Sequence, residues 1–120
     1  CHGGWRPEMD FRHGFTLVRE LGYTAVGDLL PLPALTAIHW AHRLGALVVA
    51  LYLGWLVARL WRGEYAVYAR VIAGLLAIQL ALGVSNVVFG LPLAVAVAHN
   101  AGALLLLASL VALNYKMRGN

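Results

Sequence analysis

Three long apolar runs dominate the sequence, and charged residues collect between them and at the two ends. The runs extend over residues 34–61, 66–89 and 93–114. Each is longer than the roughly 20 residues that a helix needs to cross a hydrocarbon core of about 30 Å. Pro33 and Pro92 stand near the starts of the first and third runs, where a helix tolerates proline. The pattern therefore predicts three transmembrane helices.

The composition agrees with this prediction. Hydrophobic residues make up 62% of the chain and charged residues 12%, whereas a soluble domain needs more polar surface than this. No charged residue occurs between Val71 and Tyr115. The net charge of +4 comes from cations in loops and ends, without the basic stripe that phosphate contacts need. We therefore expect an all-α membrane protein and exclude nucleic acid as a partner.

Residues 1–32 have a polar or interfacial character. Asp10 predicts the N-cap of a short helix over residues 11 to about 21, with Gly22 as its stop. Apolar and charged residues are mixed in this helix, which suits a segment lying on the membrane surface. Glycine and proline are frequent in residues 22–33, which predicts a loop.

The distribution of cations near the span ends predicts the orientation. The connection between the first two runs and the C-terminal tail are both rich in cations, while the N-terminal loop has three arginines but four acids. Cation-rich ends stay in the cytoplasm. The N-terminal loop and the turn at residues 90–93 are therefore expected outside. The cations on the inner side are Arg59, Arg62, Arg70, Lys116 and Arg118.

Two histidines on separate spans are the main candidates for chemistry, because polar groups in apolar spans commonly mark function. His42 lies nine residues after Pro33 and His99 seven residues after Pro92, about 13 Å and about 10 Å from the outer ends of their helices. At this similar depth the two imidazoles can face each other. A six-coordinate haem iron needs two such axial ligands. We therefore predict that His42 and His99 bind a haem iron, with interhelical hydrogen bonding as the alternative.

Two further residues are candidates for binding the same cofactor. Arg43 adjoins His42 and has no carboxylate in its own span, so a haem propionate would compensate its charge. Small residues surround both histidines and would let a flat macrocycle approach, although small residues also pack helices closely in lipid. His39 shares a helix face with His42. Three roles stay open for His39: a proton-handling group, a propionate contact or an interfacial histidine.

Three segments together resemble the haem A synthase family. Residues 37–46, AIHWAHRLGA, resemble its histidine-arginine motif. Residues 82–102 resemble its last two spans as found in proteobacterial members, and residues 1–15 resemble the extracytoplasmic loop that precedes the motif. The resemblance covers nearly the whole chain.

The resemblance implies an eight-span oxidoreductase, built as two four-helix halves, that oxidises a methyl group of haem O to the formyl group of haem A for cytochrome oxidase biogenesis. This chain would contribute the last three spans, most of one four-helix bundle. That bundle would hold haem b between His42 and His99, with Arg43 beside the first ligand. The catalytic N-terminal half would be absent, so no catalytic residue is expected here. His39 stands where the other half has a glutamate, whose role is not transferred.

The resemblance also implies a location, a disulfide and partners. The location is the bacterial inner membrane, with the N-terminal loop extracytoplasmic and the C-terminus cytoplasmic. Cys1 matches the second cysteine of a loop pair, and a lone thiol is the alternative. The implied partners are the missing N-terminal half or neighbouring helices, haem O as the substrate of the full enzyme, haem O synthase, and further copies of the chain.

Two alternative functions belong to other classes. The first is a bis-histidine membrane cytochrome that transfers electrons from quinol. The second is a helix-packing subunit that binds no haem. Staining for haem separates the second alternative from the haem-binding functions.

Overall fold

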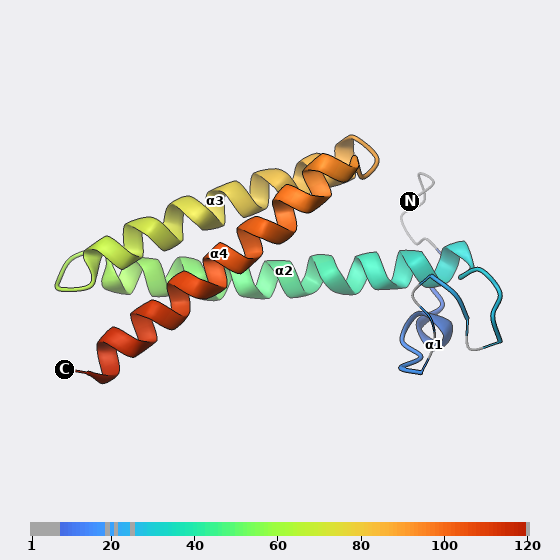
Figure 1. The fold of residues 1–120 in the computed structure, drawn as a ribbon, viewed down its shortest axis with the longest axis horizontal. Helices are drawn as coiled ribbons and strands as arrows, with labels where there is room; N and C mark the ends of the chain where they lie inside the picture. The colour runs from blue at the N-terminus through green and yellow to red at the C-terminus, as the bar shows by residue number, and fades with distance from the viewer. Residues whose placement is uncertain (1–7, 19, 21, 25, 120) are drawn as a thin grey trace. The chain divides into compact units, whose positions relative to one another are not determined.

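The structure, a computed structural model, describes residues 8–18, 20, 22–24 and 26–119. In this part of the chain there are four helices and one isolated β-bridge (Figure 1). The chain forms two compact units, residues 1–48 and 49–120, and each is described by itself. The helices in chain order are α1 (Phe11–Gly14), α2 (Leu32–Leu60), α3 (Ala66–Val88) and α4 (Leu93–Arg118).

Helices α2, α3 and α4 correspond to the three apolar runs, and each is long and apolar enough to cross a membrane. Helix α2 begins two residues earlier than predicted, at Leu32, and α4 continues to Arg118 instead of ending near residue 114. The added turn of α4 carries Lys116 and Arg118, and cations near a helix C-terminus interact favourably with the helix dipole. The prediction of an all-helical chain with three long apolar helices is confirmed.

Helix α1 is held by a cap and by close packing on α2. The Asp10 side chain accepts a hydrogen bond from the backbone N–H of His13 at 3.0 Å, so the predicted N-cap is confirmed. Gly14 is buried, and a Cβ atom added there would lie 3.0 Å from the carbonyl oxygen of Ala34 in α2. A glycine is therefore needed for this close approach.

The predicted length of α1 is wrong, because the helix ends at Gly14 and not near residue 21. The hydroxyl of Thr16 donates a hydrogen bond to the carbonyl of Arg12 at 2.9 Å. This carbonyl is the one that the backbone N–H of residue 16 would use in a longer helix, so the side chain competes with the helix. Residues 22–24 and 26–31 lie in the predicted loop, with Gly22 and Gly27 in the left-handed conformation at φ +87° and +88°.

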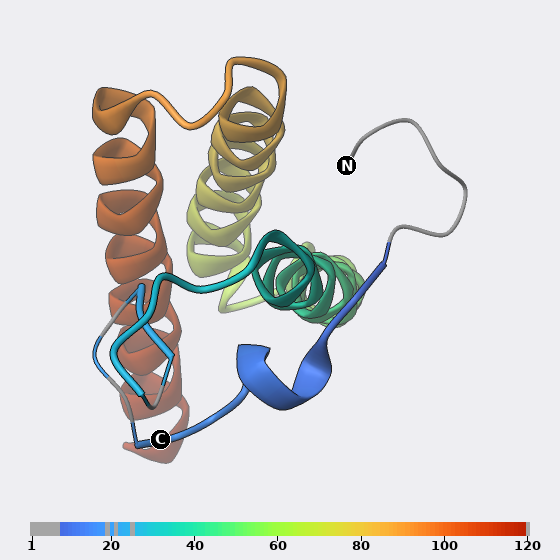
Figure 2. The same ribbon diagram turned by 90° about the vertical axis from the view of Figure 1, so that its right-hand side faces the viewer.

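In the second unit α3 packs against α4, and both views show the two helices side by side near the turn that joins them (Figures 1 and 2). The turn closes α3 in a Schellman arrangement, in which the N–H of Leu91 donates to the carbonyl of Asn86 at 2.8 Å. Gly90 adopts φ +68° and Leu91 adopts φ +61°. The second of these conformations is unfavourable for a residue with a side chain.

The α3–α4 seam changes from apolar to polar along its length. Its apolar part joins α2 in a core built on four buried residues. Towards the Gly90 turn, residues seven positions apart on each helix continue the same seam, as in a heptad repeat. The buried core residues are Leu53, Ile72, Leu106 and Leu113. The polar residues that follow at the same spacing are Gln79 and Asn86 on α3 and His99 on α4.

Candidate functional site

His99, the predicted ligand on α4, is partly buried and rests on α3. A Cβ atom added to Gly83 would lie 3.3 Å from Cε1 of the His99 ring and 3.9 Å from Nδ1. The Nδ1 atom itself is buried. The absence of a side chain at Gly83 therefore leaves the space in which this imidazole lies against the backbone of α3.

Gln79 makes the reciprocal contact from α3 to α4. A Cβ atom added to Gly102 would lie 2.6 Å from Oε1 of Gln79 and 3.3 Å from its Cδ atom. Gly102 is buried, so the amide of Gln79 occupies the space that a side chain at Gly102 would fill. Each helix thus inserts one polar side chain into a glycine socket of the other helix.

Asn86 completes the polar part of the seam. It is 7% exposed, and it lies one helical turn beyond Gly83 towards the turn that joins α3 to α4. Within the described part of the chain, Oε1 of Gln79 and Oδ1 of Asn86 are buried acceptors without a hydrogen-bond partner. Buried polar groups are normally hydrogen-bonded, so each of these two oxygens can still accept a hydrogen bond from a donor.

The insertion of Gln79 and His99 into glycine sockets across the seam was not predicted from the sequence. A signal for it does exist. In an antiparallel helix pair, the residue numbers of two facing residues add up to a nearly constant sum. Two such facing pairs, each made of a polar residue on one helix and a glycine on the other, indicate that the two helices exchange polar side chains. The value of the sum is set by the centre of the hairpin, which here is the turn at residues 90–92.

The other predicted site residues lie on α2 in the first unit. His39, His42 and Arg43 have exposed side chains, whereas Ala34 and Ala37 of the same helix are fully buried within the unit. His39 and Arg43 share a helix face, because they are four residues apart. In the part of the chain that the structure describes, Arg43 forms no ion pair.

The structure describes the two halves of the predicted haem site in separate units, with His42 in the first and His99 in the second. Among the described residues, no group of three or more His, Cys, Asp or Glu side chains comes together. A bis-histidine haem requires only two such ligands. Cys1 and its predicted disulfide lie outside the described residues.

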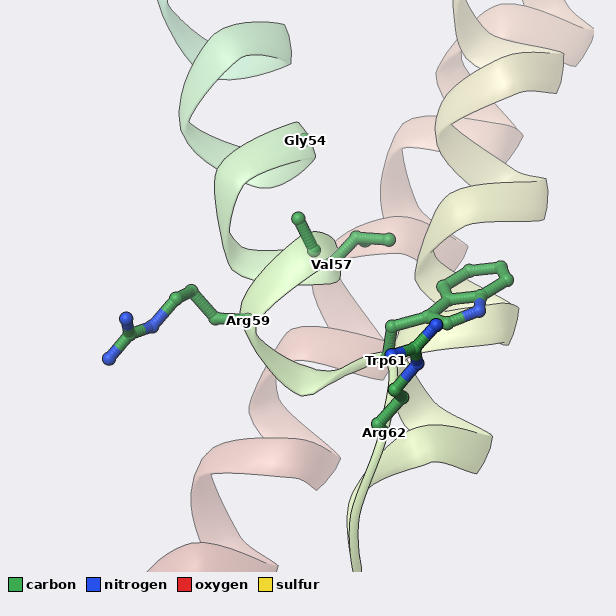
Figure 3. Close-up of a pocket in the computed structure, with 6 residues that line it drawn as sticks. Gly54, Val57, Arg59, Trp61 and Arg62 are labelled. Atoms are coloured by element: carbon green, nitrogen blue, oxygen red, sulfur yellow. The ribbon is translucent and has the colours of Figure 1, made fainter.

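A pocket of about 530 Å³ lies at the C-terminal end of α2 (Figure 3). Figure 3 shows the side chain of Arg59 extending to one side of the helix, with Trp61 and Arg62 on the other side. The guanidinium of Arg59 lies over the ring of Trp55, 6.0 Å from its centroid. Paired aromatic and cationic side chains are typical of a span end at a membrane–water interface. No candidate iron ligand lines this pocket.

The part of the chain that the structure describes is all-α and has three helices that are long and apolar enough to cross a membrane, as in a helical membrane protein. The sequence profile of the family described as COX15-CtaA, cytochrome oxidase assembly protein, matches residues 1–111. The chain therefore belongs to this family, the haem A synthase family, and the resemblance seen in the sequence is confirmed.

One relative shows how much of such a protein the chain represents. The heme A synthase of Shewanella oneidensis is 38% identical over 116 residues, which is 96% of this chain and 35% of the relative. The chain thus spans about a third of the length of the curated relative that it matches. No solved structure matches the chain.

Proposed function

We propose that this chain is the haem b-binding C-terminal part of a haem A synthase, an oxidoreductase that oxidises the methyl group of haem O to the formyl group of haem A. The observation that carries the proposal is the pair His42 and His99, on two separate apolar helices of a chain that belongs to the haem A synthase family. The catalytic half lies in the part of the enzyme that this chain does not include.

The residues present are compatible with a haem. His42 and His99 would be its axial ligands, and Arg43 would bind a propionate. An exposed guanidinium in an apolar helix is costly in lipid, and a propionate would stabilise it by a charge-assisted hydrogen bond. When bound, such a haem supplies one-electron redox chemistry. His39 shares a face with Arg43, which supports a propionate contact over the other two roles.

The proposed setting is the bacterial inner membrane, with the N-terminal loop outside and the C-terminus in the cytoplasm. The cationic residues at the end of α2 and the end of α4 support this orientation. Most of the surface of the three long helices is not buried within the chain. This surface would be covered by the N-terminal half, by neighbouring helices or by a further copy of the chain, which are the first proposed partners. The family membership adds two more: haem O, as the substrate of the full enzyme, and haem O synthase.

The proposal is tested by haem spectroscopy on the full protein to which the chain belongs, purified from haem-replete cells. We expect a low-spin bis-histidine spectrum from this half, which His42→Ala and His99→Ala each abolish. His13→Ala is the matched control, because His13 pairs with Asp10 in α1 and should leave the spectrum unchanged. The proposal would be refuted if the wild-type protein lacked this spectrum, or if the His42→Ala or His99→Ala variant retained it. Reduction by quinol without any conversion of haem O would favour the cytochrome alternative.

A further inference from the structure

The pocket at the C-terminal end of α2 is apolar at one end and cationic at the other. Gly54, Val57 and Ala58 line it within the apolar helix, and Trp61 and Arg62 line it just beyond the helix end. These five positions follow the spacing of three and four residues that places side chains on one helix face. In a membrane the pocket would therefore run along α2 from the hydrocarbon region towards the membrane–water interface.

The apolar end of the pocket is open because Gly54 has no side chain. A Cβ atom added there would have no heavy atom of another described residue within 4 Å, so this space is not filled from within the described part of the chain. Ala58, one helical turn further on, adds only a methyl group, and both residues are exposed. Small residues let an apolar neighbour approach the helix backbone closely. A hydrocarbon chain can therefore lie along this part of α2.

The cationic end of the pocket carries two arginines and is lined by no acidic residue. Among the described residues, neither Arg59 nor Arg62 forms an ion pair. Glu64 is the only acid in the connection between α2 and α3, and it does not line the pocket. Arg59 is directed to one side of α2, over Trp55, whereas Arg62 lies on the other side (Figure 3). Arg62 is therefore the direct contact for an anionic group, and Arg59 adds to the local positive potential.

We propose that this pocket binds an anionic phospholipid, with the phosphate on Arg62 and one acyl chain over Gly54 and Ala58. A guanidinium binds a phosphate through paired, charge-assisted hydrogen bonds, and basic pockets at the ends of membrane helices suit anionic headgroups. A free phosphate ion would occupy the cationic end alone, and an uncharged lipid would leave both arginines uncompensated. Only a ligand with an anionic head and an apolar chain matches the whole pocket. The inference goes beyond the proposed function and does not depend on haem.

The test is native mass spectrometry of the full protein to which the chain belongs, delipidated in detergent and titrated with phosphatidylglycerol. Phosphatidylcholine with the same acyl chains should bind more weakly, and inorganic phosphate should not displace the bound lipid. Arg62→Gln should weaken the binding of phosphatidylglycerol by about fivefold. Arg70→Gln is the matched control, because Arg70 donates to the carbonyl of Ala66 at 3.2 Å and does not line the pocket. It should leave the affinity at its wild-type value.

A second pair of variants tests the apolar end without changing any charge. Gly54→Leu fills the open space and should weaken phosphatidylglycerol binding by a similar factor, whereas Gly74→Leu, also in open space but outside the pocket, should not. Equal losses in Arg62→Gln and Arg70→Gln would indicate diffuse attraction and overturn the inference. Equal affinities for the two lipids, displacement by inorganic phosphate, or unchanged binding in Gly54→Leu would overturn it as well. None of these results bears on the haem spectrum, so the proposed function is tested separately.

Discussion

Replacing Gly102 by alanine tests the packing of the polar seam. The new Cβ atom would lie 2.6 Å from Oε1 of Gln79, so the amide must move away by most of an ångström. Overpacking of this kind costs about 1–3 kcal/mol, and the higher helix propensity of alanine offsets about 1 kcal/mol of it. Gly102→Ala should therefore lower the free energy of unfolding by as much as about 2 kcal/mol.

Gly74→Ala is the matched control, because Gly74 lies in α3 with no heavy atom within 4 Å of its added Cβ. It should gain up to about 1 kcal/mol from helix propensity alone. The assay is reversible unfolding of the protein in detergent micelles by increasing SDS. Combining Gly102→Ala with Gln79→Ala removes the clash, so the double-mutant cycle should give a favourable coupling of about 0.5–3 kcal/mol. A zero coupling, or equal effects of the two glycine substitutions, would refute the socket.

Two further predictions concern the turn and the cap. Leu91→Gly should raise the free energy of unfolding by about 1–2 kcal/mol in the same assay, because Leu91 adopts φ +61°, and a loss of stability would contradict this. The hydrogen bond from the His13 N–H, together with that from the His13 side chain, holds the pKa of Asp10 below its ordinary value of 3.8. The stabilising effect of this cap is therefore complete above the ordinary pKa and is lost as the pH falls through the lowered one. The NMR shift of the His13 amide should titrate below pH 3.8 in the wild type and not at all in Asp10→Asn; a midpoint at or above 3.8 would show that the cap is absent.

The sequence by itself determined where the long helices lie. A helix in lipid must satisfy its backbone hydrogen bonds within the segment and present apolar side chains all round, so its position depends on local composition alone. The Asp10 cap was predictable for the same reason, since its partner His13 is three residues away. The end of α1 was mispredicted even though its cause is also local. The hydroxyl of Thr16 and the helix backbone compete for one carbonyl, and the apolar pattern does not show which prevails.

Only the tertiary structure decided which glycine of the neighbouring helix each polar side chain packs against. From the sequence, His99 was a candidate ligand and Gln79 was one polar residue in an apolar run. The structure places His99 against Gly83 and Gln79 against Gly102, and it shows that both side chains lie in one seam. Such a contact depends on the register and rotation of two helices, and small residues at many positions permit several packings in lipid. The depth of a histidine in the membrane is thus a property of its own helix, whereas the environment of its second nitrogen depends on the neighbouring helix.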